Sequence, residues 1–337
     1  MKNKIICDVS IAVLTYNHVN TLPQCLESLL MQRANCSFEI VIADDCSNDG
    51  AVELLWQYVK KYPDQIRMLP NDYNRGICPN IVRLFKACTG KYTMICEGDD
   101  WWEDGKLQKQ FDYMESHPDC SICYTDFNEY YEGIGQTKPA IIQHLGWQAN
   151  RETLSWKAQL TNMRFWFATA SICCRNDRLQ QCINEDAIWQ DQTLSLADLI
   201  IRLGVGQRGE VGFIPEVLCT YRINVCGNSA SRLKDPQKMI KLQLDDLKIR
   251  RFYMNNTLDS EEEAQVMGHY IRALIPIVSL MHRPAVLHNL RQWIVTYQYM
   301  LNKRERLLLA ASKYFLLGKL LSVYRNALRH NKAGNKR

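Results

Sequence analysis

Short apolar runs alternate with amphipathic segments in the first third of the chain. Four of these runs are apolar at almost every position, which is typical of strands buried on both faces of a sheet: residues 9–14, 39–43, 66–69 and 92–96. Between them, apolar residues recur at helical spacing in the segments 22–30, 51–62 and 81–88. Because buried strands alternate with helices, the pattern predicts an α/β fold with a mostly parallel central sheet flanked by helices.

The rest of the chain has a less regular pattern and then becomes helical. We expect a loop-rich stretch at 130–156, strands at 163–174 and 211–214, and a helix at 193–203. Beyond residue 235 the spacing predicts helices only, at 236–255, 260–281, 285–301 and 304–328. Two parts are therefore expected: an α/β domain over residues 1–235 and an all-helical C-terminal extension over residues 236–337.

Polar residues follow each of the four strands predicted in the first third. In sheets of this kind, ligands bind at the carboxyl ends of the strands. The candidate loops are Thr15-Tyr16-Asn17, Asp44-Asp45, residues 71–76 with Arg75, and Glu97-Gly98-Asp99-Asp100. Three of these four loops carry acids, which is typical of a binding site at one edge of the sheet.

The loop Glu97-Gly98-Asp99-Asp100 places three carboxylates within four residues. Carboxylates this close disfavour each other's charge unless a cation compensates. Mg²⁺ and Mn²⁺ take oxygen ligands and often bridge one or two carboxylates to substrate phosphates. Such a cation also neutralises charge on a departing diphosphate. The alternative is a plain turn in which an Asp caps the segment before Trp101.

The loops at Asp44-Asp45 and Arg75 each have two interpretations. The two acids could accept hydrogen bonds from a base N–H or from ribose hydroxyls, and Arg75 could reach a phosphate or a base. Asp, Asn and Gly are also common turn residues, so both loops could be plain turns.

Five blocks of the sequence, in order and spacing, resemble family-2 glycosyltransferases: residues 9–17, 39–49, 74–76, 87–92 and 97–100. The resemblance runs from about residue 8 to residue 230. It implies the GT-A fold, with a nucleotide-sugar-binding part at about 8–125 and an acceptor part at about 126–235. It also implies inverting transfer of a sugar from a nucleotide-diphosphate donor, which we expect to be UDP-linked, to a hydroxyl of a glycan or lipid-linked acceptor.

The resemblance also assigns residues to the donor site. Thr15, Asp44 and Asp45 stand where the family contacts the nucleoside. Asp99 stands at the metal-binding position, with Glu97 as the second, longer ligand to Mg²⁺ or Mn²⁺. The whole expected donor-binding set is Thr15, Tyr16, Asn17, Asp44, Asp45, Arg75, Glu97, Gly98, Asp99, Trp102 and Arg222.

Two of these assignments have structural alternatives. Trp102 could stack on a sugar face or pack in the core beneath the acidic loop. Arg222 lies in the block Tyr221-Arg222-Ile223-Asn224 and could steady the diphosphate or an acidic acceptor. Asn224 stands where a His often sits in the family, which removes a side chain that could contact a phosphate or a metal.

The segment 189–194 resembles the family block whose Asp opens a helix, so Asp191 is the expected catalytic base. An acceptor hydroxyl must lose a proton as it attacks the anomeric carbon, and a carboxylate can take it. The alternative is an acid that offsets the dipole at a helix N-terminus. Asp186 and Glu185 are the rival bases.

Charge and cysteine content bear on where the protein works. The net charge of +5 comes from the tail, since residues 303–337 hold ten Lys or Arg and one acid, Glu305. The fourteen cysteines lie largely in apolar runs, and Asp8 interrupts the apolar start, so we expect a reduced, cytoplasmic protein without a signal peptide. No run reaches the ~20 apolar residues of a membrane span. The basic tail helix either attaches to the cytoplasmic face of a membrane or packs on the catalytic domain.

Two other classes of protein are alternatives to a glycosyltransferase. Residues 204–209 match the dinucleotide fingerprint of oxidoreductases, but they follow a predicted helix and precede a strand, which is the wrong order. A non-enzymatic protein that binds a nucleotide or a membrane is the second alternative.

Nucleic acid is not expected as a partner, because the pattern of the tail indicates an amphipathic interfacial helix. Cys120 and Cys123 have the spacing of a metal or redox pair, but no second pair follows them.

Overall fold

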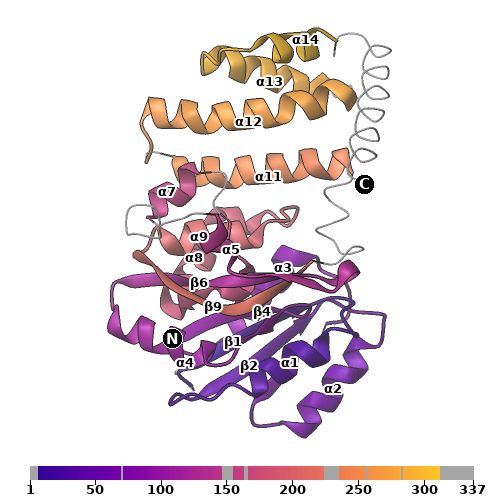
Figure 1. The fold of residues 1–337 in the computed structure, drawn as a ribbon, viewed down its shortest axis with the longest axis vertical. Coiled ribbons are helices and arrows are strands. Elements are labelled where there is room, and N and C mark those ends of the chain that lie inside the picture. The colour runs from indigo at the N-terminus through magenta and orange to yellow at the C-terminus, as the bar shows by residue number, and fades with distance from the viewer. Residues whose placement is uncertain are drawn as a thin grey trace. The chain divides into compact units, whose positions relative to one another are not determined.

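The computed structural model describes residues 7–69, 71–145, 155–162, 166–223, 235–255, 257–281 and 284–311. Two compact units make up the chain, Met1–Ala230 and Ser231–Arg337. The first is an α/β unit and the second is entirely helical in its described residues (Figure 1). The predicted α/β fold with a helical C-terminal extension is therefore confirmed.

The α/β unit is built on one nine-stranded sheet in the order β3-β2-β1-β4-β8-β6-β9-β5, with β7 paired to β6. The strands are β1 Val9–Thr15, β2 Phe38–Asp44, β3 Ile66–Leu69, β4 Tyr92–Glu97, β5 Trp101–Trp102, β6 Cys120–Tyr131, β7 Gln136–Lys138, β8 Cys173–Arg175 and β9 Glu210–Ile223. The first four strands are mutually parallel, and β6 is parallel to β9. Strands β5, β7 and β8 pair antiparallel.

Helices cover the sheet as the apolar runs require, because β1, β2 and β4 have fully buried side chains on both faces. The helices are α1 Leu22–Leu30, α2 Ala51–Lys61, α3 Ile77–Ala87, α4 Lys106–Ser116, α5 Ile141–His144, α7 Trp156–Thr161, α8 Asn176–Glu185 and α9 Ala197–Gly206. Helix α3 packs on β1 and β2 and also touches α8 and α9. Figure 1 shows α1 and α2 lying together beside β1 and β2, and the Tyr58 hydroxyl of α2 donates to Glu27 of α1.

Three predicted elements of the second half were wrong in extent. Within the described residues 166–174 of the expected strand at 163–174, only Cys173 and Cys174 are in a strand, which continues to Arg175, and Thr169–Ser171 forms a 3₁₀ turn. Helix α9 begins at Ala197 instead of residue 193. A short apolar run does not distinguish strand from buried loop, because both bury their side chains.

Strand β9 extends well beyond the predicted 211–214 and reaches Ile223. Its pairing with β6 is irregular at the middle: Ile214 pairs with Thr125 and Val217 with the next residue, Asp126, so Pro215 and Glu216 bulge out. A proline cannot donate to a ladder, which is why it sits at a bulge. The bulge hides the continuity of the strand from the sequence pattern.

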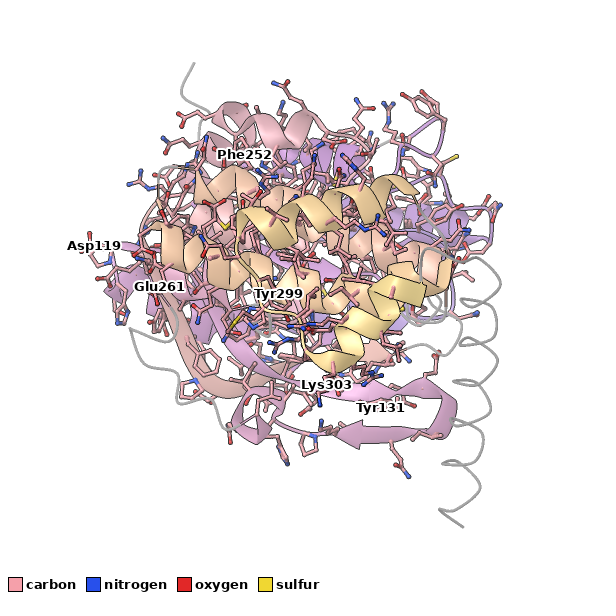
Figure 2. All side chains as sticks on the ribbon, turned by 90° about the horizontal axis from the view of Figure 1, so that it is seen from above. Asp119, Tyr131, Phe252, Glu261, Tyr299 and Lys303 are labelled. Carbon is pink, nitrogen blue, oxygen red and sulfur yellow. The ribbon has the colours of Figure 1, made fainter. Side chains whose placement is uncertain are left out.

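The helical unit has a hydrophobic core of its own. Its helices are α11 Pro236–Met254, α12 Ser260–Met281, α13 Pro284–Thr296 and α14 Lys303–Ala311. The buried residues of this core are Ile240, Ile271, Leu274, Ile275, Leu287, Leu290 and Leu309. Figure 2 shows Tyr299 on the turn between α13 and α14, where its hydroxyl accepts from Arg272 and donates to Glu305.

Two expectations about the whole chain, on its cysteines and on membrane-spanning segments, can be compared with the described residues. The thirteen cysteines of the described residues are free thiols, including Cys120 and Cys123 within β6. Among the described residues, no helix is long and apolar enough to cross a membrane. Most of the basic tail helix predicted at 304–328 lies outside the described residues, which end at Ala311 in α14.

Candidate active site

The carboxyl ends of β1, β2 and β4 form the edge of the sheet where the candidate residues gather. Strand β1 lies between the other two, with Thr15 in register with Asp44 and Leu14 in register with Glu97. The loops that leave these three strands therefore start side by side. We call this side of the sheet the carboxyl edge.

The loops after β1 and β2 are joined by hydrogen bonds. The Asn17 backbone N–H donates to Ser47 Oγ at 2.8 Å, and the Asn17 side chain accepts from the backbone of Asn48 at 3.0 Å. Asn17 and Cys46 have positive φ angles of 56° and 64°, two of the four such non-glycine residues in the described chain. Non-glycine residues in this region of backbone space carry strain, and such strain gathers at binding sites.

The two acids after β2 organise the neighbouring loops. Asp44 is 1% exposed and accepts from the backbone N–H of Ser47 at 2.8 Å, and from its hydroxyl. Asp45 accepts from the backbone N–H groups of Arg75 at 2.8 Å and Gly76 at 2.9 Å. Asp45 thereby brings Arg75 to the carboxyl edge. Each carboxylate keeps lone pairs beyond those bonds.

Arg75 is half-buried, and its side chain is held flat against the loop after β3. Its Nε donates to Asn71 at 2.6 Å, and one terminal nitrogen donates to the Tyr73 hydroxyl at 2.9 Å. The guanidinium also lies 4.3 Å from the centre of the Tyr73 ring. Because a guanidinium has five N–H donors, this anchored side chain can still bind an anion.

The acidic loop after β4 is attached to the loop after β1. The Gly98 N–H donates to the Leu14 carbonyl at 2.9 Å, and the Thr21 hydroxyl donates to the Gly98 carbonyl at 3.0 Å. The space beside Gly98 is closed to larger residues, because a Cβ there would lie 2.6 Å from Thr15 Oγ1 and 3.0 Å from His18 Nδ1. Glycine at this position therefore lets the acidic loop approach the end of β1.

The two aspartates of the acidic loop face different environments. The Asp99 side chain is 23% exposed, while Asp100 is 1% exposed and accepts from the Arg222 backbone N–H at 2.9 Å. Burial, followed by the nearby charges of Asp99 and Glu97, holds the pKa of Asp100 well above its usual value. Asp100 thus supports the loop, and Asp99 is the acid that faces outward.

Arg222 is committed to the protein itself. Its guanidinium donates to the Asp99 carbonyl at 2.8 Å, to Glu132 at 3.1 Å and to the Gln24 side chain. It also lies over the rings of Trp101 and Tyr130, at 5.0 and 5.4 Å from their centres. These hydrogen bonds and ring contacts attach the acidic loop to β9, so that the Arg222 side chain supports the loop. The neighbouring Asn224 lies outside the described residues.

The remaining predicted donor contacts are split between surface and core. Tyr16 is 39% exposed and Asn17 is exposed at the carboxyl edge. Trp102 is 3% exposed in β5, where the Lys106 ammonium lies 4.9 Å from its ring centre. The structure therefore places Trp102 in the core beneath the acidic loop.

Asp191 was expected to open a helix. It instead follows the 3₁₀ turn Ala187–Gln190, and α9 begins six residues later, at Ala197. One of its carboxylate oxygens accepts from the backbone N–H and the hydroxyl of Thr193, at 2.9 and 2.6 Å. This turn replaces the first helical turn predicted at 193. Its position is nevertheless close to the Arg75 loop, because the Cys78 thiol at the start of α3 donates to the Leu194 carbonyl at 3.1 Å.

The rival bases are engaged elsewhere. Asp186 is 8% exposed and forms a two-pronged ion pair with Arg208, at 3.0 and 2.6 Å. Glu185 is exposed on α8 and lies 3.5 Å from the same guanidinium.

His18 was missed by the sequence reasoning. Its Nε2 lies 3.8 Å from Asp99 Oδ2, and its buried Nδ1 has no hydrogen-bond partner within the described part of the chain. The available signal was its place, directly after Asn17 in the polar loop that follows β1.

The acidic loop is suited to a cation that also binds a ligand. No group of three or more His, Cys, Asp or Glu side chains is gathered as a metal site in the described residues. Magnesium-type sites commonly use one or two protein carboxylates together with substrate phosphates. Asp99, with Glu97 two residues before it, fits that kind of site.

The fold and this edge define the class of protein: an α/β protein whose acids and arginine gather at the carboxyl edge of its sheet, where ligands bind in folds of this class. Residues 10–180 match the family model described as glycosyl transferase family 2. The chain belongs to glycosyl transferase family 2. The dinucleotide-like residues 204–209 lie in the buried end of α9 and the turn after it, which agrees with their rejection as a cofactor loop.

Known proteins similar to this chain extend the comparison. An uncharacterised protein of Mycobacterium bovis is 30% identical over 231 residues, covering 68% of this chain and 63% of that protein. The chain thus spans less than two thirds of this relative. The structure of S. aureus TarS 1-349 in complex with UDP-GlcNAc matches with a TM-score of 0.55 at 16% identity, over 91% of both chains.

A mannosyltransferase from Pyrobaculum calidifontis, in complex with GDP-Man and Mn²⁺, matches with a TM-score of 0.54 at 13% identity. This match covers 95% of the present chain and 88% of the other. Both structural matches show a shared fold, and they confirm the expected GT-A architecture.

Proposed function

We propose that the protein is an inverting glycosyltransferase that moves one sugar from a UDP-linked donor to a hydroxyl of a glycan or lipid-linked acceptor. The observation that carries the proposal is the joined carboxyl edge, where Thr15, Asp45, Arg75 and Asp99 come together from four loops. Membership of family 2 supports the reaction class. The UDP-GlcNAc and GDP-Man in the structural matches support a nucleotide-sugar donor.

In this proposal the loops after β1 and β2 bind the nucleoside. Thr15, Tyr16, Asn17, Asp44 and Asp45 supply hydroxyl, amide and carboxylate groups for base and ribose. Because Asp44 and Asp45 already hold the loop backbone, the nucleoside meets a preformed surface and loses less entropy of loop ordering on binding. Arg75 lies beside this surface, where a phosphate would follow the ribose.

The acidic loop serves the diphosphate. Asp99 and Glu97 would hold Mg²⁺ or Mn²⁺, which when bound neutralises charge on the departing diphosphate. The Mn²⁺ in the mannosyltransferase structure supports this choice of cation. Gly98 lets the loop lie against β1, and Trp102 and Arg222 act as supports beneath and behind it.

Asp191 is the proposed catalytic base. In an inverting transfer the acceptor hydroxyl attacks the anomeric carbon from the side opposite the leaving diphosphate, and its proton passes to the base. One oxygen of this partly buried carboxylate accepts from the backbone N–H and the hydroxyl of Thr193, which fixes the orientation of the side chain. We assign the binding of the acceptor to residues 126–235. The helices of residues 236–337 form an extension of the catalytic domain. The basic tail of this extension would contact the cytoplasmic face of a membrane.

A panel of nucleotide sugars tests the reaction. The full chain is incubated with each donor, with Mg²⁺, Mn²⁺ or EDTA, and with simple glycosides as acceptors. Release of UDP that depends on the cation, with a new glycosidic bond of inverted configuration by NMR, is the expected result. Absence of cation-dependent turnover across UDP-, GDP- and dTDP-sugars would refute the proposal.

Asp191→Asn tests the base. Loss of a general base lowers the turnover number by about 10²- to 10⁴-fold, while the Kd for UDP stays unchanged because Asp191 does not touch the nucleotide in this proposal. The matched control is Asp177→Asn, an exposed acid in the first turn of α8. Turnover of Asp191→Asn within threefold of the control would exclude Asp191 as the base.

A further inference from the structure

We propose that His18 is a nitrogen ligand of the cation held at Asp99, and that it makes the site prefer Mn²⁺ to Mg²⁺. The inference rests on the proposed function, because it assigns a residue to the cation of that site. His18 lies in the loop after β1, three residues beyond Thr15, and its side chain faces the acidic loop.

The distance between the two side chains suits a shared ion. His18 Nε2 and Asp99 Oδ2 are 3.8 Å apart, and both side chains are about a quarter exposed, at 26% and 23%. Two ligand atoms that each lie ~2.1 Å from one octahedral ion are ~3.0 Å apart when adjacent and ~4.2 Å apart when opposite. The observed separation falls between these limits.

The other ring nitrogen of His18 supplies the second observation. A metal-bound histidine nearly always donates its remaining N–H to an acceptor, which fixes the tautomer that coordinates. His18 Nδ1 and Thr15 Oγ1 are both buried, and neither has a hydrogen-bond partner among the described residues. Both atoms border the same small space, within 3.0 Å of the point where a Cβ on Gly98 would stand.

The two buried groups can satisfy each other when the ion is bound. An Nδ1–H that donates to the Thr15 hydroxyl leaves the Nε2 lone pair directed toward Asp99. Buried polar atoms without partners are rare in folded proteins, and two of them facing one space indicate a state with a ligand. Because Gly98 has no side chain, the space between these two groups stays open, which is a second role for glycine at this position.

The nitrogen ligand sets the choice of metal. Mg²⁺ prefers oxygen ligands and strict octahedral geometry, whereas transition ions accept imidazole readily. A site made of Asp99 and His18 therefore binds Mn²⁺ more tightly than a site of carboxylates alone, while its affinity for Mg²⁺ gains little.

Pulsed EPR on Mn²⁺ tests the ligand directly. The full chain is loaded with Mn²⁺, with and without UDP, and the ¹⁴N hyperfine coupling to the ion is recorded. The wild type is expected to show the coupling, and His18→Asn to lack it. Mn²⁺ titration should show at least a 10-fold weaker Kd for His18→Asn, with the Mg²⁺ Kd changed less than threefold.

Two further variants keep the test decisive. His117→Asn removes a histidine at the opposite edge of the sheet, where the His117 carbonyl accepts from Arg175 beside the first residue of β4, and it should retain the coupling. Thr15→Val keeps His18 but removes the buried hydroxyl, so Mn²⁺ alone should bind about 3- to 10-fold more weakly. Equal unfolding temperatures by circular dichroism establish that the variants are folded.

The outcomes separate this inference from the proposed function. Coupling and Mn²⁺/Mg²⁺ selectivity that are the same in His18→Asn and His117→Asn would overturn the role of His18, even if the wild type transfers sugar. Failure of the wild type to bind Mn²⁺ would overturn it as well. Lack of sugar transfer by a wild type that binds Mn²⁺ with nitrogen coupling would refute the transferase and leave the ligand assignment standing.

Discussion

The polar groups at the two ends of the same three strands, β1, β2 and β4, differ in whether all of them are hydrogen-bonded. At the amino edge, Ser10 accepts from the backbone N–H groups of Thr89 and Gly90 and donates to Glu39, and Glu39 also accepts from Arg67. At the carboxyl edge, Thr15 Oγ1, His18 Nδ1 and Asp100 Oδ2 are buried without partners in the described structure.

The difference is the one expected if the polar groups of the amino edge serve the fold and those of the carboxyl edge serve the proposed ligand. A hydrogen bond made within the protein contributes about 1 kcal/mol, whereas a buried polar atom left unpaired costs about 1–3 kcal/mol. The amino edge gains from its network in the free protein. The carboxyl edge bears this cost, which a bound cation and diphosphate can offset.

Matched carboxylate substitutions give the largest expected contrast. Asp99→Asn should lower cation-dependent turnover by about 100-fold or more, because it removes the outward-facing ligand of the carboxyl edge. Its unfolding temperature should stay the same or rise, since a repelling charge beside Glu97 and Asp100 is lost. Glu39→Gln at the amino edge should keep wild-type turnover, measured in the same donor assay. Equal turnover in both variants would contradict the assignment of the ligand to the carboxyl edge.

The glycines at the two edges give the next contrast. A Cβ on Gly90 would lie 2.5 Å from the Ser10 backbone nitrogen and 2.7 Å from the Val9 backbone carbon, so the backbone itself must move. Gly90→Ala should therefore destabilise the protein by about 2–4 kcal/mol in urea unfolding. A Cβ on Gly98 meets only the side chains of Thr15 and His18 among its nearest atoms.

Compared with Gly90→Ala, Gly98→Ala should lower the stability of the protein less and weaken the binding of Mn²⁺ and UDP more. The Thr15 hydroxyl and the His18 ring can rotate, but the Thr15 Cβ, 2.8 Å from the added Cβ, moves only with the loop, so about 1–3 kcal/mol of stability is lost, while the Kd for Mn²⁺ with UDP rises by about 10-fold or more. Urea unfolding and isothermal titration on the two alanine variants measure both quantities. A larger loss of stability in Gly98→Ala than in Gly90→Ala would contradict this assignment of the edges.

Acid sensitivity at the amino edge is the smallest expected effect. Burial tends to raise the pKa of Glu39, but hydrogen bonds from Ser10 and Arg67 outweigh it, and the net pKa lies below its usual value. A carboxylate whose folded pKa is lowered stabilises the protein above its unfolded pKa of about 4.3. That contribution is lost as the pH falls through the folded pKa.

Glu39→Gln should therefore unfold about 2–4 °C below the wild type at pH 7, which corresponds to about 1 kcal/mol in a domain of this size. The difference should shrink as the pH falls below about 4. Thermal melts from pH 3 to 7 measure it. A gap that widens toward low pH would show that Glu39 is not held in its ionised form.

Much of the carboxyl edge could be predicted from the sequence. The apolar runs located β1, β2 and β4, and parallel strands end at the same edge, so the residues that follow them had to lie close together. Thr15, Asp44 and Glu97 are indeed the last residues of their strands. The resemblance to family-2 glycosyltransferases then favoured a donor site over plain turns for all four loops.

The second half could be predicted less well, because its structure depends on pairing over long distances. Strand β9 was underestimated since Pro215 interrupts it, and only its alignment with β6 makes the strand continuous. The helix expected from residue 193 starts at Ala197, because the Asp191 carboxylate binds Thr193 and forms a turn instead. A local pattern cannot say which of two available hydrogen bonds the backbone will take.

By itself, the sequence determined which residues stand at the ends of the strands, because burial on both faces needs apolar runs and the polar loops must begin where those runs stop. Tertiary structure alone decided which polar groups are satisfied. The backbone N–H of Arg222 donates to Asp100, 122 residues away, and its guanidinium donates to the Asp99 carbonyl, so that Arg222 supports the acidic loop. Beside Gly98, His18 Nδ1 and Thr15 Oγ1 are left without hydrogen-bond partners among the described residues. Whether a buried group has a partner depends on distances in space, and the order of residues along a chain does not contain those distances.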